Sequence, residues 1–188
     1  MRDLMRSFAW SVVLVVAAVP AATGAELAYV GAKKCKACHF KEYTSWAGTK
    51  MAKAFELLKP GVAAEAKKAA KVDPAKDYTA DATCLACHTT GYKKPGGFVD
   101  MATTPDLAGV QCEMCHGPGG TYTQKEHMSL QNKEYRKADI VKVGLVGSIG
   151  KDQCAACHNK KSPFFKAFDF AARVKQGTHE KVPLKYPH

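Results

Sequence analysis

One five-residue pattern, Cys-x-x-Cys-His, occurs four times in this chain of 188 residues and constrains its fold more than any other feature. The four copies are Cys35-Lys36-Ala37-Cys38-His39, Cys84-Leu85-Ala86-Cys87-His88, Cys112-Glu113-Met114-Cys115-His116 and Cys154-Ala155-Ala156-Cys157-His158. This pattern is the covalent attachment site of c-type haem. Both cysteines lie on one face of a helical turn and can bond to one macrocycle edge, and the histidine supplies the proximal ligand to iron. The sequence therefore predicts four haem c groups.

All eight cysteines of the chain belong to these motifs, which bears on two alternative interpretations. Paired Cys-x-x-Cys also builds zinc sites, but zinc does not require a histidine at the same offset four times. Eight cysteines in an exported chain could form a disulfide framework, but such a framework leaves the four histidines unexplained. Haem attachment accounts for both residue types at once.

Residues 1–25 have the pattern of a secretory signal. Arg2 and Arg6 form a basic start, an apolar run follows, and small residues end at Ala25. The apolar run is short for a bilayer span, so an uncleaved anchor is the alternative. We expect a cleaved signal and an exported protein of residues 26–188, periplasmic or extracellular, with no stable membrane insertion.

The predicted fold class is mainly α: a small single domain wrapped around four haems, with little regular β structure. Macrocycles are large apolar bodies, so the polypeptide surrounds them instead of building a large core of its own. Apolar spacing predicts helical structure over 40–58, which Gly48 weakens in the middle and in which Thr49 could cap a second helix. It also predicts a helix over 62–71 and a helix start at Ser162. Residues 121–135 can be a polar helix, and 98–101 a short strand. First cysteines of successive motifs are 49, 28 and 42 residues apart, which is not a regular repeat.

The chain is basic, with a formal net charge of +11. Each haem adds two propionates, so the loaded protein is less basic than its sequence. The excess is concentrated from Lys33 to Lys76, where eleven lysines accompany four acidic residues. A basic face can steer an acidic redox partner, and a merely solvated surface is the alternative. Nucleic-acid binding is not expected of an exported chain whose core is haem.

Second axial ligands for the four irons are in short supply. The candidates are the remaining histidines and the methionines beyond the signal segment: His127, His179, His188, Met51, Met101, Met114 and Met128. Met114 lies inside a haem-binding turn and points badly toward another iron. We therefore expect about one iron to lack a good sixth ligand.

Several segments outside the bare motifs carry a family likeness over most of the mature chain. They are Lys33-Lys34-Cys35, Trp46, Ala52-Lys53-Ala54, Leu58-Lys59-Pro60, Asp73-Pro74-Ala75-Lys76-Asp77-Tyr78-Thr79, Gly109-Val110-Gln111-Cys112-Glu113, Cys115-His116-Gly117-Pro118-Gly119 and His179-Glu180. In these segments the chain resembles the tetrahaem cytochrome c-554 family.

The resemblance implies a role for each candidate ligand. By position, His127 matches the family's distal ligand of haem 1 and His179 that of haem 4, and the haem at His88 is five-coordinate in the family. Met51 stands where the family has the histidine that serves haem 3. Surface positions for the two histidines and a core position for Met51 are the alternatives, and the terminal His188 is a weaker candidate for haem 2.

Three functions are compatible with these residues. The first is an exported carrier, more an electron-transfer protein than an enzyme, that moves electrons between redox partners through closely packed haems. The second is a reductase of a small molecule, nitric oxide by resemblance, at the open iron held by His88, although the sequence has no evident catalytic acid or base there. The third is a subunit of an extracellular multihaem polymer, which His127 and His179 within one chain make unnecessary.

Overall fold

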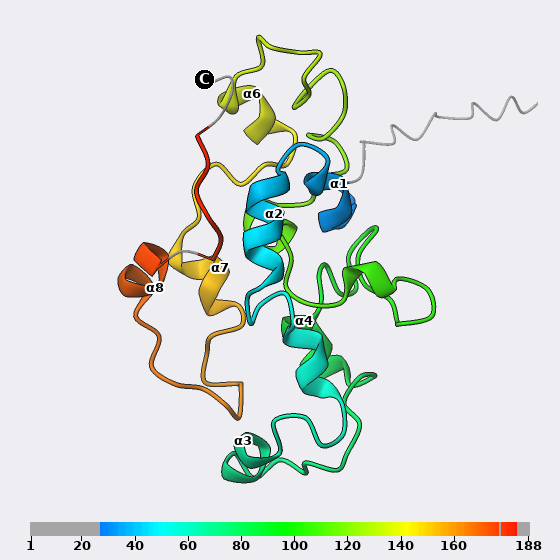
Figure 1. Cartoon of the computed structure of the whole chain (residues 1–188), viewed down its shortest axis with the longest axis vertical. Helices are drawn as coiled ribbons and strands as arrows, with labels where there is room; N and C mark the ends of the chain where they lie inside the picture. Colours follow the sequence, from blue (N-terminus) through cyan, green and yellow to red (C-terminus); the bar gives the residue numbers. More distant parts are fainter. Residues whose placement is uncertain (1–26, 177, 184–188) are drawn as a thin grey trace, which may run out of the picture.

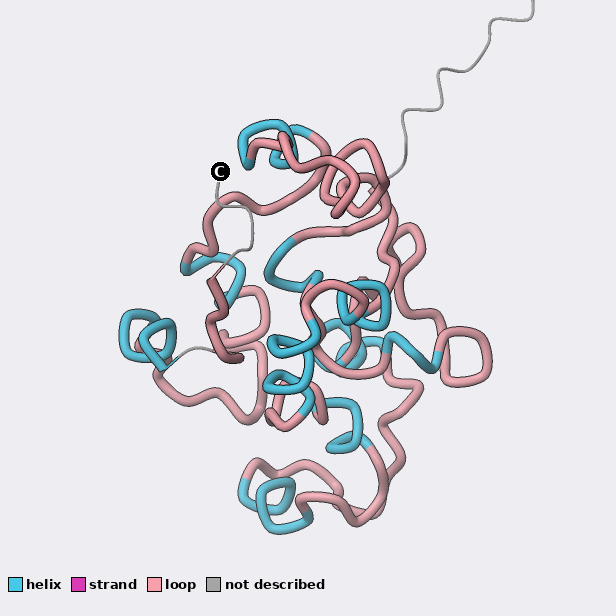
Figure 2. Tube along the Cα trace, turned by 45° about the horizontal axis from the view of Figure 1, so that its top comes forward, coloured by secondary structure: helices cyan, strands magenta, loops and turns pink. Residues whose placement is uncertain are grey.

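The computed structural model describes residues 27–176 and 178–183, so the predicted signal segment and His188 lie outside the described residues. Short helices joined by long connections make up this part of the chain (Figures 1 and 2). In chain order they are α1 (Ala32–Lys36), α2 (Phe40–Ala47), η1 (Ala54–Leu58), α3 (Ala64–Ala69), α4 (Ala82–His88), η2 (Pro105–Leu107), α5 (Glu113–His116), α6 (Lys137–Lys142), α7 (Lys151–Ala155) and α8 (Phe170–Gln176).

Regular β structure is absent from the described residues. Two isolated bridges occur there, Thr89 with Ala108 and Ser129 with Asn132. The prediction of a mainly α fold with little β structure is therefore confirmed.

Two of the predicted helices are present in shortened form. The predicted helix over 40–58 is divided into α2 and the 3-10 helix η1, with turns between Ala47 and Ala54. The helix predicted over 62–71 is α3, and it begins after Ala63, whose φ of 53° lies in the left-handed region.

The polar helix predicted over 121–135 is wrong, because this segment is a series of turns. Side chains there hydrogen-bond the backbone in place of a helical ladder. The Ser129 hydroxyl donates to the carbonyl of Lys125, and the Asn132 amide donates to the carbonyls of Glu126 and His127. Serine and asparagine compete with helix formation in this way.

Two smaller expectations are also wrong. Residues 98–101 form no strand, since the Asp100 carboxylate accepts from the amides of Ala102 and Thr103 and turns the chain. Ser162 starts no helix; its hydroxyl accepts from the amide of Phe164 within a loop, and α8 begins later, at Phe170.

The buried polypeptide core is small and lies against the second haem motif. Phe55, Leu58, Leu85, Phe98 and Leu107 form one cluster, in which Leu85 sits between the two cysteines of that motif. The rings of Phe55 and Phe98 have centroids 5.6 Å apart. Large apolar side chains remain exposed elsewhere, among them Phe40, Leu130, Phe164 and Phe165. This apolar surface is what a chain wrapped around macrocycles presents to them.

Buried hydrogen bonds fasten the first haem motif to the third. The amide of Ala32 donates to Gln111 Oε1 at 2.7 Å, and that of Gly31 to Glu113 Oε2 at 2.7 Å. Gly31, the residue before helix α1, has no side chain that could cap the helix. The first amides of a helix nevertheless need hydrogen-bond partners. Side chains about 80 residues further along the chain supply them.

The backbone around Gly109 connects α2, the second motif and the third motif. The Trp46 indole donates to the carbonyl of Val110 at 2.9 Å, the amide of Val110 donates to Met51 at 2.9 Å, and that of Gly109 to His88 at 3.0 Å. Gly109 has φ +84°, and a Cβ there would collide with the carbonyl of Ala52. Glycine is the residue that permits this close approach.

Candidate haem centres

Each motif folds as a single helical turn, which brings its two thiols and its imidazole together. The histidine amides of the first, third and fourth motifs donate to the carbonyl of their own first cysteine, each at 2.9 Å. The second motif lies wholly within α4. That helix is capped by Asp81, whose carboxylate accepts from the amide of Thr83 at 2.9 Å.

Thiols of different motifs meet in two pairs. The Cys35 and Cys112 thiols lie close to each other, and their interaction raises the pKa of Cys35 and lowers that of Cys112. The Cys87 and Cys157 thiols are likewise close, and their interaction lowers the pKa of Cys87 to about 7 and raises that of Cys157. The first motif therefore adjoins the third, and the second adjoins the fourth.

The third and fourth motifs are also neighbours. Burial raises the pKa of Cys115, and the nearby Cys154 raises it further. Together with the two thiol pairs, this proximity indicates the spatial order first, third, fourth, second. The order along the chain is different, so neighbouring haems would be held by segments far apart in sequence.

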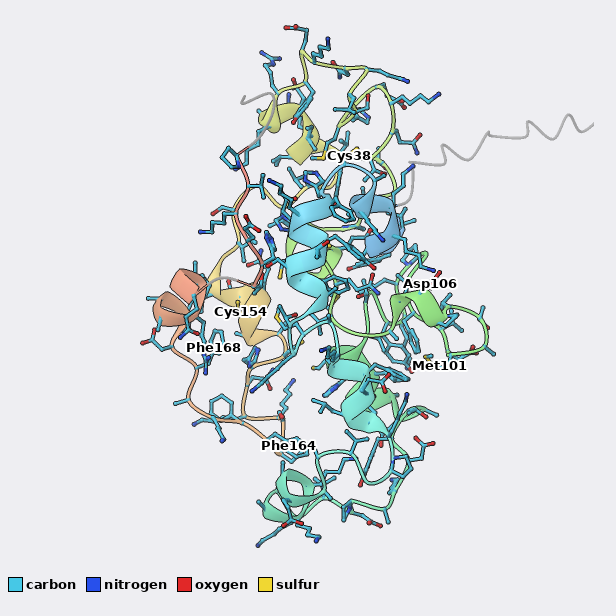
Figure 3. All side chains as sticks on the ribbon, viewed as in Figure 1. Cys38, Met101, Asp106, Cys154, Phe164 and Phe168 are labelled. Carbon is cyan, nitrogen blue, oxygen red and sulfur yellow. The ribbon has the colours of Figure 1, made fainter. Side chains whose placement is uncertain are left out.

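The His88 imidazole is held through its Nδ1 atom, which hydrogen-bonds the carbonyl oxygen of Ala54 at 2.6 Å. An Nδ1–H donated to this oxygen leaves Nε2 with its lone pair free for a metal. His39 Nδ1 lies 3.7 Å from Glu42 Oε1, beyond hydrogen-bonding distance. The ring of His158 stacks on that of Phe168, with centroids 4.5 Å apart, and Figure 3 labels Phe168 near Cys154 of the same motif.

The ring of His179 faces that of His116. Their centroids are 6.3 Å apart and the planes are inclined by 39°. Two metal–imidazole bonds of about 2 Å, plus the distance from each nitrogen to its ring centre, account for this separation. Burial lowers the pKa of His116, with smaller contributions from His179 and His39, and the neutral imidazole is the form that binds metal.

This geometry differs from the expected partner of His179. The resemblance assigned His179 to the fourth haem, held by His158, whereas the structure sets it opposite His116 of the third motif. If an iron were bound between these two rings, His116 and His179 would be its axial ligands.

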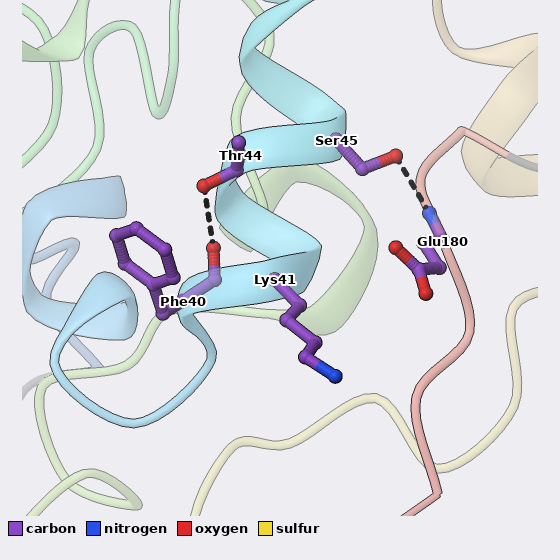
Figure 4. Close-up of a pocket in the computed structure, with 5 residues that line it drawn as sticks. All are labelled: Phe40, Lys41, Thr44, Ser45 and Glu180. Carbon is purple, nitrogen blue, oxygen red and sulfur yellow. Dashed lines mark hydrogen bonds between the residues drawn. The ribbon is translucent and has the colours of Figure 1, made fainter.

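The C-terminal segment reaches His116 because it is tied to α2. The amide of Glu180 donates to Ser45 Oγ at 2.8 Å, and His179 Nδ1 lies 2.6 Å from the carbonyl oxygen of Glu180. Figure 4 shows this contact at a groove that is also lined by Phe40, Lys41 and Thr44. Nothing in the sequence spacing singles out Ser45, because the residues it joins are 135 positions apart.

The other two candidate distal ligands make backbone hydrogen bonds. The amide of His127 donates to the carbonyl of Gln124, and its own carbonyl accepts from Asn132. The carbonyl of Met51 accepts from the amides of Ala54 and Val110. Both side chains are half-buried.

These residues fit covalent haem. The eight cysteines are unbridged, and the described part of the chain gathers no group of three or more His, Cys, Asp or Glu side chains that could hold a metal ion. Four macrocycles require pairs of thiols for attachment, imidazoles oriented toward iron, and exposed apolar side chains to pack against, and the chain has all three. When bound, each iron supplies one-electron chemistry, and the chain supplies axial ligands, burial and charge.

A small α-helical chain that carries four such turns is a multihaem c-type cytochrome. A sequence model of the family described as "Cytochrome c554 and c-prime" matches residues 34–117. Cytochrome c-554 of Nitrosomonas europaea is 42% identical over an alignment of 139 residues that covers 71% of this chain and 59% of that protein. The reduced cytochrome c554 structure from the same species superimposes with a TM-score of 0.76 at 36% identity, covering 86% of this chain and 89% of that one. The chain belongs to the cytochrome c-554 family, and its cofactors are four haem c groups.

No helix within the described residues is sufficiently long and apolar to cross a bilayer.

We expect Ser45→Ala to loosen His179. The lost hydrogen bond is worth about 1 kcal/mol, so the fraction of molecules with a detached C-terminal segment should rise up to about fivefold. The measurement is the amplitude of carbon monoxide binding to the reduced, haem-loaded protein beyond that of the wild type. Thr44→Ala is the matched control, because the Thr44 hydroxyl donates to Phe40 within α2. Equal amplitudes in the two variants would contradict the role of Ser45.

Proposed function

We propose that this protein is an exported electron carrier that conducts electrons through its haems in the spatial order first, third, fourth, second. The observation that carries the proposal is the pairing of thiols from different motifs, Cys35 with Cys112 and Cys87 with Cys157. Haems bonded to neighbouring sulfur atoms would have close edges, and close edges favour fast transfer. The haems of the first and second motifs are then the two ends of the path.

Both the N-terminal segment and the covalent attachment of haem support export of this protein. The basic start, apolar run and small residues of 1–25 are those of a secretory signal, and c-type haem is attached outside the cytoplasmic membrane. The periplasm is the proposed location of the mature protein.

A partner with an acidic surface would dock at the end of the path formed by the first motif. Lys33, Lys34 and Lys36 surround Cys35 in α1, and all three are exposed. Lys33 pairs with Asp106 at 2.7 Å, which leaves Lys34 and Lys36 as the clearest contributors. Complementary charge of this kind raises association rates more than affinity.

The axial ligands follow from position and geometry. The facing rings of His116 and His179 support a bis-histidine third haem, and the family position of His127 supports it as the distal ligand of the first. Met51 remains a candidate ligand, and its family position assigns it to the third haem if His179 serves the fourth. The second haem, held by His88, keeps an open position.

The carrier function and its docking end are tested together by charge reversal. Loaded protein with Lys34→Glu and Lys36→Glu should accept electrons from reduced plant-type ferredoxin, an acidic donor, at least several-fold more slowly than wild type at low salt. Stopped-flow absorbance of the haems measures the rate. The control variant, Lys68→Glu with Lys71→Glu, makes the same change in net charge in and just after α3, which lies toward the opposite end of the molecule (Figure 1). Equal rates in both double variants would reject the docking end, and haems that cannot be reversibly reduced would reject the carrier.

The haem at His88 is expected to be high-spin and open to small ligands. Reduced protein should bind one equivalent of carbon monoxide rapidly, because no distal ligand has to leave first. Optical titration gives the stoichiometry, and His179→Ala is the control that should add a second equivalent at the haem held by His116. A spectrum unchanged by the gas would contradict an open second haem, and rapid turnover of nitric oxide with an electron donor would favour the reductase alternative.

The haem that Met51 ligates is expected to have the highest potential of the four. Thioether sulfur is a softer ligand than imidazole and favours ferrous iron. Met51→His should lower one potential by roughly 100 mV or more, within the range of about 0.8 V that axial ligands span. Met51→Leu keeps the apolar volume and should turn one low-spin haem high-spin. If neither variant changes a potential or a spin state in a redox titration followed by EPR, Met51 is a packing residue.

A further inference from the structure

A buried carboxylate lies between the first and third haem motifs. Glu113 is 1% exposed. Its Oε1 accepts from the amides of Val30 at 2.9 Å and Gly119 at 2.7 Å, and its Oε2 accepts from Gly31 at 2.7 Å and Val30 at 3.2 Å. A Cβ on Gly119 would come within 3.1 Å of Oε1, so glycine allows the loop to approach.

These partners fit the ionised form. Backbone amides can only donate, and both oxygens of Glu113 are already occupied as acceptors. A proton on either oxygen would face a donor instead of an acceptor. The donors are neutral, so they solvate the negative charge without cancelling it.

The charge acts on both haem attachment sites. Glu113 directly follows Cys112 in the chain, and its Oε2 accepts from the amide of Gly31, four residues before Cys35. A negative charge fixed at this place disfavours an added electron on haems bonded to Cys35 and Cys112.

We propose that Glu113 is a potential-setting residue that holds the haems of the first and third motifs at lower reduction potentials than they would otherwise have. The inference deepens the proposed electron carrier and rests on it. Low potentials at this end would direct electrons onward, toward the fourth and second haems. The hydrogen bonds of Glu113 to the loop before α1 fix its distance from both attachment sites, so the charge cannot move away from them.

The competing explanation is that Glu113 only fastens Val30, Gly31 and Gly119 together. Glu113→Gln separates charge from shape, since it keeps the side-chain length and one carbonyl oxygen. In a spectroelectrochemical titration of the loaded protein, two of the four potentials should rise, each by about tenfold in the reduced-to-oxidised ratio, or about 59 mV for one electron. Glu65→Gln is the control, because that side chain is 88% exposed and should leave all four potentials in place. Lower thermal stability with unchanged potentials would overturn the proposal.

A second pair of variants keeps the test decisive if Glu113→Gln does not fold. Val30→Lys retains the carboxylate and its amide donors and adds a cation beside them, because Val30 is 38% exposed. It should raise the same two potentials, whereas Val62→Lys, at a valine that is 36% exposed near α3, should not. Equal effects of the two lysines would overturn the proposal.

A failure of the proposed carrier function and a failure of the proposed role of Glu113 give different experimental results. Wild-type protein whose haems do not exchange electrons with any donor would reject the carrier function itself. Wild-type protein with four reversible haems, and a Glu113→Gln variant with the same four potentials, would reject only the role of Glu113.

Discussion

Covalent attachment of each macrocycle at two points is the constraint on which the rest of this structure depends. Once four apolar bodies are bonded to the chain, the polypeptide needs only a small core of its own, and the cluster around Phe55 and Leu85 is that core. Elsewhere the chain is short helices and long connections (Figure 2). Large side chains such as Phe40 and Leu130 remain uncovered by protein. The haems therefore supply both the function and much of the apolar burial that favours folding.

Contacts between distant segments give each haem a different environment. The third motif is enclosed: the ring centroids of His116 and His179 are 6.3 Å apart, and the buried Glu113 directly follows its first cysteine in the chain. The fourth motif is more open, and Phe168 stacks on its histidine. Haem potentials respond to ligand, burial and nearby charge. Four identical motifs can thus give four different potentials, which a directional carrier requires.

Local patterns in the sequence predicted the features that depend on neighbouring residues. The haem motifs, the mainly α fold and helix α3 depend on spacing over a few positions, and the structure agrees with all of them. The failures have local causes that spacing alone does not reveal. In the segment of 121–135, for example, Ser129 and Asn132 satisfy the backbone with side-chain bonds where helical spacing predicted a ladder.

Long-range contacts could not be predicted in this way. Family position assigned His179 to the fourth haem, whereas the structure places its ring 6.3 Å from that of His116, so the haem that His179 serves stays a prediction. The bond from Glu180 to Ser45 spans 135 positions, and those from Val30 to Glu113 span 83. No periodicity encodes such pairs; they exist because the folded chain brings the first and third motifs together. The spatial order of the motifs is the same kind of property, since it depends on which thiols meet.

Locating the four irons in the loaded protein tests this account most directly. Anomalous diffraction at the iron absorption edge assigns each iron to its motif without reference to the protein fold. The account predicts that the iron of the first motif neighbours that of the third, the third neighbours the fourth, and the fourth neighbours the second. Irons of the first and second motifs that lie side by side, or a third iron without His179 opposite His116, would contradict it.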